Sequence, residues 1–281
     1  MPSCPSCQQP ASKRNGFDRR GRQKYACRAC RCTFTESTAS AFSGYRWPKD
    51  VILTAVRWYL AYPLSSRQVL ELLAERGIDV SHRTVLHWVQ AFGPQLAAEV
   101  RRRRRPVGTR WFVDEVFLFR KGHKLYLYRA IDEEGVVVDV LLRERRDTAS
   151  AQAFFRQAIE RTGVSPHEVV TDRHQPYLKA VATICPGAQH SRTGLHRARG
   201  ETTKAVERSH VPTRDRLRNS RGLKRTETGQ RFLEGFEAMR HLRRDGAPGA
   251  GHLVRGPAVH ARVREVAAVI HTLGRGLRRR P

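Results

Sequence analysis

Apolar residues recur every three or four positions through residues 46–94, a spacing typical of amphipathic helices. The first stripe consists of Val51, Ile52, Ala55, Val56, Trp58 and Tyr59. Ser65 or Ser66 can cap a second helix, ended by Gly77, with apolar residues Val69, Leu70, Leu72 and Leu73. Ser81 can cap a third helix with apolar residues Val85, Leu86, Trp88, Val89 and Phe92. The pattern therefore predicts three consecutive helices.

The last two predicted helices, over residues 66–92, have the helix, short turn, helix spacing of a helix-turn-helix motif. In such a motif the second helix enters the DNA major groove, with its first residues against the bases. The residues expected to contact DNA there are His82, Arg83, Thr84, His87 and Gln90. The alternative is an ordinary helical hairpin that serves only packing.

A run of five arginines, Arg101 to Arg105, follows these helices and is closed by Pro106. A charge run ended by a residue that cannot continue a helix indicates a linker. We expect its arginines, Arg101, Arg102 and Arg103 among them, to contact DNA phosphates.

Beyond Pro106 the pattern changes to strands. Three strand-like segments, Trp111–Phe119, Lys124–Ile131 and Val136–Leu142, are joined by turns that contain Gly122 and Gly135. A helical pattern over 148–161 and a short buried strand over 168–172 come next. Three antiparallel strands, a helix, and a further strand with helices predict an α/β domain of the ribonuclease-H-like kind.

Charge points to the partner of this protein. The 281 residues include 53 Lys and Arg but only 26 Asp and Glu, a formal charge of +27. Such an excess favours a polyanion, since phosphate neutralisation releases counterions; a merely solvated basic surface is the alternative. There is no apolar run of about 18 residues and no apolar signal core at the N-terminus, so we expect neither membrane insertion nor secretion.

Five of the six cysteines lie within the first 32 residues. Two CxxC pairs, Cys4 with Cys7 and Cys27 with Cys30, can close four thiolates around Zn²⁺. Tyr25 and Phe34 would supply the apolar packing of this small ribbon. Cys32 could replace Cys30 or be a spare thiol, and a metal-free cysteine-rich tail is the alternative to zinc.

Three carboxylates are candidates for a catalytic metal site. Asp114 lies inside the apolar strand 112–117, where a charge is costly unless it is paired or binds a cation. Asp172 ends its strand, and Glu207 lies in a helical stretch. Three carboxylates can chelate two Mg²⁺ ions about 4 Å apart. Glu115 is the rival of Asp114, although strand alternation directs it to the opposite face; Asp132, Asp139 and Asp147 are interpreted as turn or surface acids.

Several motifs resemble one family. They are Tyr45-Arg46-Trp47, residues 56–60, Ala74-Glu75-Arg76-Gly77, Val113-Asp114-Glu115, residues 125–132, Thr171-Asp172, residues 206–210 and residues 235–239. Over roughly residues 43–244 the chain is similar to DDE-class insertion-sequence transposases, closest to the insertion-sequence-six family. The 34 residues between Asp172 and Glu207 equal that family's spacing. The resemblance implies that Asp114, Asp172 and Glu207 hold catalytic Mg²⁺ or Mn²⁺.

The chain departs from this family pattern at two places. A zinc ribbon is absent from the family's minimal form, although related transposases carry one. Ser209 stands where the family often has an acid. His210, on the helix face of Glu207, could orient the scissile phosphate or merely pack.

The sequence thus predicts four parts: a zinc ribbon at 1–40, a helix-turn-helix module at 43–100, a ribonuclease-H-like catalytic domain at 107–244, and a flexible basic tail at 245–281. The predicted function is a transposase that binds the terminal inverted repeats of its element, cleaves its ends and joins them to target DNA. It would act as a homodimer or higher oligomer on DNA in a bacterial or archaeal cytoplasm. The alternatives are another nuclease of this fold and a DNA-binding regulator derived from a transposase.

Overall fold

The computed structural model describes residues 2–4, 6–7, 9–10, 12–19, 21–35, 41–120, 123–192, 204–218 and 223–244. The predicted basic tail at 245–281 and the turn residue Gly122 lie outside these ranges.

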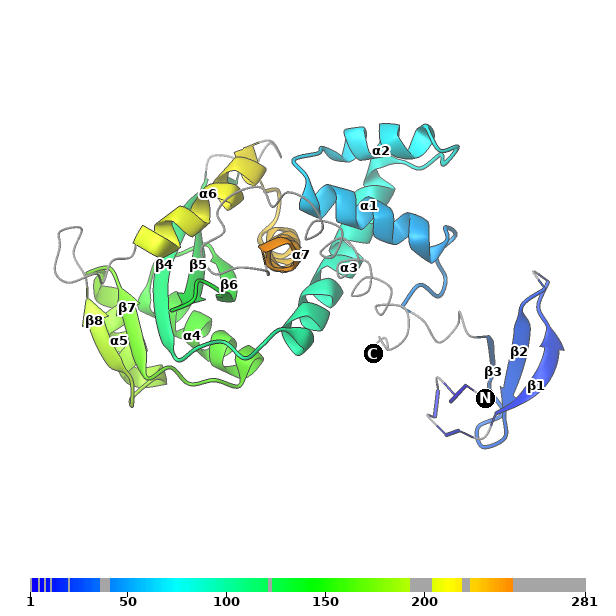
Figure 1. Cartoon of the computed structure of the whole chain (residues 1–281), viewed down its shortest axis with the longest axis horizontal. Helices are drawn as coiled ribbons and strands as arrows, with labels where there is room; N and C mark the ends of the chain where they lie inside the picture. Colours follow the sequence, from blue (N-terminus) through cyan, green and yellow to red (C-terminus); the bar gives the residue numbers. More distant parts are fainter. Residues whose placement is uncertain are drawn as a thin grey trace.

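The N-terminal module is a small antiparallel sheet with strand order β1-β2-β3 (Figure 1). Its strands are β1 (Ser12–Phe17), β2 (Gln23–Cys27) and β3 (Thr33–Thr35). The Phe34 ring is buried and stacks on Tyr25 with 5.8 Å between ring centroids. These are the two aromatic residues that the sequence assigned to the packing of this module.

The three predicted helices are present as α1 (Lys49–Ala61), α2 (Ser66–Ala74) and α3 (His82–Arg103). Ser65 caps α2 with a capping box, because its hydroxyl accepts the Gln68 N–H while the Gln68 side chain accepts the Ser65 N–H. Ser81 caps α3 by accepting the Thr84 N–H. Both helix starts are therefore set by local sequence, as predicted.

The end of α3 differs from the prediction. The helix continues past Pro94 and includes Arg101, Arg102 and Arg103, so the arginine run is not a linker up to that point. Leu96, Ala97 and Val100 are buried on this extension. Their packing favours continuation of the helix, which outweighs the loss of one backbone hydrogen bond at the proline.

The second sheet has five strands in the order β6-β5-β4-β7-β8. They are β4 (Arg110–Arg120), β5 (His123–Asp132), β6 (Val137–Arg143), β7 (Glu168–Thr171) and β8 (Gln189–Arg192). The β4–β5 and β5–β6 pairs are antiparallel, and the β4–β7 and β7–β8 pairs are parallel. The first four strands were predicted. The fifth, β8, was not, because Gln-His-Ser-Arg carries no apolar alternation.

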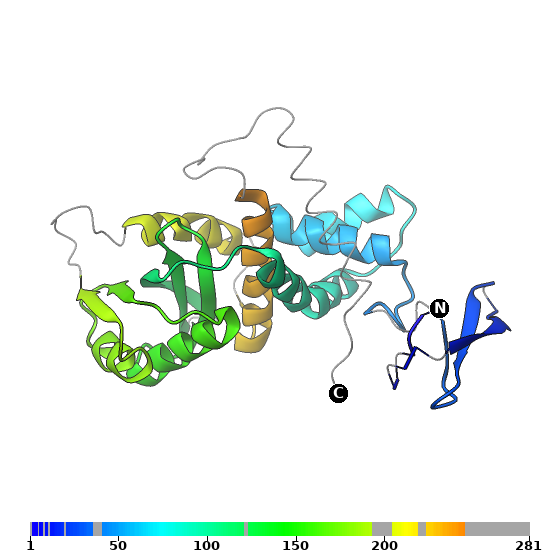
Figure 2. The same cartoon turned by 60° about the horizontal axis from the view of Figure 1, so that its bottom comes forward.

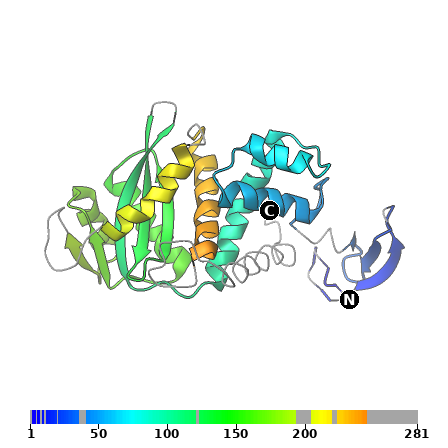
Figure 3. The ribbon, with the colours of Figure 1, turned by 45° about the horizontal axis from the view of Figure 1, so that its top comes forward.

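Helices cover both faces of this sheet. One face packs against α4 (Thr148–Thr162) and α5 (Gln175–Ile184), and the other against α6 (Lys204–Arg218) and α7 (Thr226–Arg244) (Figures 1 and 3). This arrangement, with its strand order, is the α/β ribonuclease-H-like architecture predicted from the sequence.

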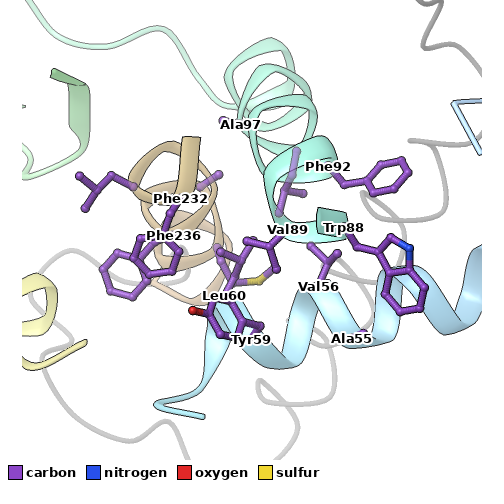
Figure 4. Close-up of a cluster of buried hydrophobic side chains, with 14 of the residues drawn as sticks. Ala55, Val56, Tyr59, Leu60, Trp88, Val89, Phe92, Ala97, Phe232 and Phe236 are labelled. Atoms are coloured by element: carbon purple, nitrogen blue, oxygen red, sulfur yellow. The ribbon is translucent and has the colours of Figure 1, made fainter. Parts of the chain in front are cut away.

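Helix α7 joins the helical module to the sheet. It lies between α1–α3 and the five-stranded sheet (Figure 2). Side chains from α1, α3 and α7, among them Leu60, Val89 and Phe236, meet in one cluster (Figure 4). The same hydrophobic core also contains residues of β4, β5 and β6. The helices α1 and α3 and the five-stranded sheet therefore share a core.

The approach of α3 to α7 is closest at Gly93 and Gly235. A Cβ atom added at Gly235 would lie 2.9 Å from the Cα of Gly93 and 3.0 Å from Cδ1 of Leu60. Both distances are below normal contact, so only glycine permits the two helix backbones to approach this closely.

We predict that Gly235→Ala destabilises the protein by about 1–3 kcal/mol through overpacking, despite a gain in helix propensity of about 1 kcal/mol. Gly229→Ala is the matched control in the same helix, because its Cβ would meet only the side-chain ends of Leu142 and Leu223, which can move. Chemical denaturation of both variants is the measurement. Equal stability of the two variants would contradict the role of the glycine contact.

Candidate active site

Asp114 and Asp172 come from neighbouring parallel strands. Asp114 lies on β4, and Asp172 directly follows β7, which pairs with β4 through Phe112 and Val170. Their carboxylates, together with that of Glu115, have oxygen atoms within 4.8 Å of one another. The structure thus brings together two of the three predicted ligands. Hard carboxylate oxygens at this spacing fit a divalent cation such as Mg²⁺.

Glu115 reaches the same place from the other side of β4. Its side chain is only 1% exposed, against 19% for Asp114 and 39% for Asp172. The neighbouring Trp111 and Val113 belong to the core below α4 and α5, while Val116 belongs to the core on the α7 side. Alternation along β4 therefore holds, but it does not keep the Glu115 carboxylate away from those of Asp114 and Asp172. We call these three residues the acidic group.

Arg146 bridges two of these acids and was not identified from the sequence. Its Nε and Nη2 atoms donate to the two Glu115 oxygens over 3.2 and 3.1 Å, and Nη2 also donates to Asp172 Oδ2 over 2.9 Å. The other Asp172 oxygen accepts the backbone N–H of His174 over 2.9 Å. In the sequence Arg146 is one basic residue among 53, with no spacing that distinguishes it.

Helix α6 packs against β4 and faces Asp114. Its residue His210 is fully buried, with Nδ1 3.6 Å from Asp114 Oδ2, too far for a hydrogen bond. Burial, reinforced by Arg129 and Arg214, lowers the pKa of His210 to about 3, so the ring is neutral near pH 7. Glu207 is described only as part of the α6 backbone, one turn before His210 on the helix.

The three acids interpreted as turn or surface residues have structural partners. Asp132 accepts backbone N–H groups of the turn that follows β5, and Asp147 caps α4 by accepting the Ser150 N–H. Asp139 is buried and pairs with Arg161 over 3.2 Å, so its assignment to the surface is wrong. A register shift between β5 and β6 accompanies this placement, with Asp139 opposite Ala130.

The start of α3 presents the residues expected to contact DNA. Arg83 and His87 are exposed, and Thr84 is half-buried with its hydroxyl against Ser81. A groove of about 500 Å³ runs beside Thr84 and His87, with Tyr45 and Trp47 on its other side. His87 also lies near the Tyr45 ring, with centroids 6.1 Å apart.

Gln90 does not belong to this surface. Its amide donates to the carbonyl of Thr228 on α7 over 3.0 Å, so its side chain points into the contact between α3 and α7. We therefore leave Gln90 out of the surface proposed to contact DNA. Residues 83, 87 and 90 are spaced by four and three, so they share one face of α3, and Gln90 differs from the other two by its place further along the helix, beside α7.

The arginine run is largely engaged within the protein. Arg102 and Arg103 pair with the buried Glu99, and Arg104 donates to carbonyls of Val137 and Val138 on β6. Arg105 pairs with Asp132 and Glu134, and burial lowers the pKa of Arg101. The side chain of Arg102 is still 72% exposed. Contact between the arginine run and DNA phosphates therefore stays a prediction, and Arg102 is the best placed residue for it.

The four cysteines of the two CxxC pairs converge. Their sulfur atoms lie within 4.8 Å of one another, with 3.5 Å between Cys4 and Cys30 and between Cys7 and Cys27. Cys32 is not in this group, and its sulfur lies 3.8 Å from the Thr33 carbonyl oxygen. Four thiols gathered in this way fit tetrahedral Zn²⁺, with Cys30 rather than Cys32 as the fourth ligand.

Comparison with known proteins agrees with this geometry. Residues 108–246 match a protein-family model described as a DDE domain. Residues 108–246 are therefore similar to a DDE domain. The resemblance drawn from the sequence motifs is thereby confirmed for this part of the chain, and the acidic group lies inside the DDE domain.

Two curated relatives from Staphylococcus aureus are similar to this DDE domain. The transposase for insertion sequence-like element IS431mec is 42% identical over 136 residues, which are 48% of this chain and 60% of the relative. The transposase for insertion sequence element IS257 in transposon Tn4003 is 41% identical over 136 residues, again 48% of this chain and 60% of the relative. The match thus spans about three fifths of each of these relatives.

Solved structures are similar to part of this chain at low TM-scores. The magnesium complex of the HTLV-2 integrase catalytic core domain, in its dimeric form, is 22% identical, with a TM-score of 0.33 over 41% of this chain and 73% of that one. The catalytic core domain of BIV integrase is 18% identical, with a TM-score of 0.37 over 59% and 98%. Both superpositions are partial, and the ribonuclease-H-like character of the DDE domain rests on its own strand order.

We predict that the purified protein carries about one Zn²⁺ per chain, bound by Cys4, Cys7, Cys27 and Cys30. Cys7→Ser or Cys27→Ser should release the metal and unfold only the N-terminal module, because so small a core depends on its metal. Cys32→Ser is the matched control and should retain zinc. Elemental analysis measures the metal, and a zinc-free protein purified without chelators would contradict the ribbon.

Proposed function

We propose that this protein is a transposase: it binds the terminal repeats of a mobile element, cleaves at the element ends and joins the 3′-hydroxyls to target DNA. The observation that carries the proposal is the convergence of Asp114 and Asp172 at neighbouring parallel strands of a DDE domain, beside the helix that contains Glu207. The two Staphylococcus aureus relatives, both transposases, support the same function.

In this proposal Asp114, Asp172 and Glu207 hold Mg²⁺ or Mn²⁺. When bound there, such ions would supply activation of the attacking water or 3′-hydroxyl and stabilisation of the leaving oxygen. The protein's own part is to gather negative charge at one point of the sheet. The backbone N–H of His174 and the guanidinium of Arg146 orient Asp172 for this purpose.

Recognition of DNA is assigned to the helix-turn-helix module. Arg83 and His87 are exposed at the start of α3, beside the half-buried Thr84, in the part of a recognition helix that meets base edges. The zinc ribbon and Arg102 add basic surface for phosphates. The protein would act on DNA as a dimer or higher oligomer, because two element ends are joined together. None of the described helices combines the length and apolarity needed to cross a bilayer.

We predict that Asp114→Asn, Asp172→Asn and Glu207→Gln each lower strand transfer at least about a hundredfold, because the amide removes charge that holds the metal ions. DNA binding should be unchanged. Glu160→Gln, on the exposed side of α4, is the control for loss of an acid and should transfer strands normally. The measurement is joining of labelled terminal-repeat DNA to a plasmid in Mg²⁺.

The same assay separates the alternatives. A resolvase or a hybrid nuclease would cut DNA or RNA without joining ends, and a regulator derived from a transposase would bind DNA without cutting. Near-normal transfer by any one of the three variants would remove that residue from the set of ligands.

We predict that Arg83→Ala weakens binding to the terminal repeat more than binding to random DNA, since each good base contact contributes about 1–3 kcal/mol of discrimination. Arg67→Ala is the matched control on α2, an exposed arginine of the helix that crosses the DNA backbone. It should weaken both complexes equally. Binding is measured on both DNAs at several salt concentrations, and equal losses for Arg83→Ala would show that another part reads the repeat.

A further inference from the structure

The proposed function assigns Asp114 and Asp172 of the acidic group to the metal ions. The group contains a third carboxylate, that of Glu115. Asp114, Glu115 and Asp172 lie within 4.8 Å of one another, and all three offer oxygen atoms to a cation. Ligand chemistry alone therefore does not decide between Asp114 and Glu115. The contacts of Arg146 distinguish them.

Arg146 donates a hydrogen bond to each of the two carboxylate oxygens of Glu115. Its Nε and Nη2 atoms meet Oε1 and Oε2 over 3.2 and 3.1 Å, the bidentate geometry that makes arginine–carboxylate pairs strong. The same Nη2 atom is 2.9 Å from Asp172 Oδ2. The contacts of Arg146 do not include Asp114 among the described residues.

Burial of Glu115 increases the energetic importance of its ion pair with Arg146. The Glu115 side chain is 1% exposed and lies among the buried tyrosines Tyr128 and Tyr177. The pKa of Tyr177 is raised by burial and then by the negative charge of Glu115. A carboxylate in such surroundings needs a cation, because removing the partner of a buried ion pair leaves an uncompensated charge.

A carboxylate whose two oxygens both accept guanidinium N–H groups has its charge offset by the arginine and keeps only its remaining lone pairs for a metal ion, so it is a weaker ligand. Asp172 is held differently, because Arg146 contacts only one of its oxygens, the other accepts the backbone N–H of His174, and the side chain is 39% exposed. Asp114 is not contacted by Arg146. The ion pair therefore withdraws Glu115 from the acidic group while it leaves Asp172 accessible.

On this basis, and resting on the proposed metal-dependent function, we propose that Arg146 is a positioning residue that selects the metal ligands: it sequesters Glu115 and holds Asp172 beside Asp114. Its positive charge also offsets the repulsion among three carboxylates. Without Arg146, Glu115 would join the site, and the more negative site would bind a divalent ion more tightly but in the wrong geometry.

The test measures Mn²⁺ binding to the full-length, zinc-loaded protein by electron paramagnetic resonance of the free ion. Arg146→Ala should bind Mn²⁺ about tenfold more tightly than the wild type, because a nearby positive charge is lost and a third carboxylate is released. Strand transfer should nevertheless fall. Tighter metal binding with lower activity is a combination that mere loss of folding does not produce.

Two further variants isolate the ion pair. The double variant Glu115→Gln with Arg146→Ala should return to wild-type Mn²⁺ affinity, because both charges of the pair are gone. Arg146→Lys, which keeps the charge but loses the bidentate geometry, should fall between the wild type and Arg146→Ala. Arg156→Ala, an exposed arginine on α4, is the charge control and should bind Mn²⁺ as the wild type does.

The possible failures are distinguishable. Unchanged or weaker Mn²⁺ affinity in folded Arg146→Ala, checked by circular dichroism, would overturn the role of Arg146. If Arg146→Ala does not fold, Arg146→Lys provides the same test, and wild-type affinity in that variant would overturn the proposal. Loss of binding in Glu115→Gln but not in Asp114→Asn would make Glu115 the ligand and also overturn it. The proposed function itself predicts a Mn²⁺ site in the wild type that Asp172→Asn abolishes. If the wild type has no such site, the proposed function is overturned.

Discussion

The close approach of α3 to α7 at Gly93 and Gly235 is the contact on which the arrangement of the helical module and the DDE domain depends. Because neither residue has a side chain, the two helix backbones meet, and Leu60, Val89 and Phe236 close around the contact. The same helix α7 packs on β6, and its Glu237 pairs with Arg129 of β5 over 3.1 Å. One helix therefore supports the helical module on one side and the five-stranded sheet on the other.

Polar contacts extend this link toward the acidic group. Arg129 lies opposite Asp114 in the β4–β5 register, and Glu237 also accepts from Thr213 of α6, the helix that contains Glu207. Arg216 of α6 donates to the carbonyls of Tyr59 and Leu64 in the helical module. Arg129 and Glu237 form a buried ion pair, Arg216 donates to backbone carbonyls, and together these contacts hold α6 against both modules.

The fold brings three carboxylates of the acidic group close together, and their negative charges repel one another. Adjacent parallel strands deliver Asp114 and Asp172 to one point, and Glu115 reaches it from below the sheet. Like charges this close are unfavourable without a cation. Arg146 supplies one permanent positive charge, and the proposed Mg²⁺ ions would supply the rest during catalysis.

Local signals determined much of this protein in advance. Helix caps at Ser65 and Ser81, strand alternation, the two CxxC pairs and the DDE motifs depend on near neighbours in the chain. The sequence alone therefore predicted α1 to α3, the first four strands of the large sheet, the gathering of four cysteines and the fold class. Tertiary packing decided the rest. The extension of α3 through Pro94, the inward turn of Gln90, the burial of Asp139 and the bridge made by Arg146 each depend on a partner far away in sequence. No periodicity records such a partner, because the free energy of these contacts arises only when distant elements have come together.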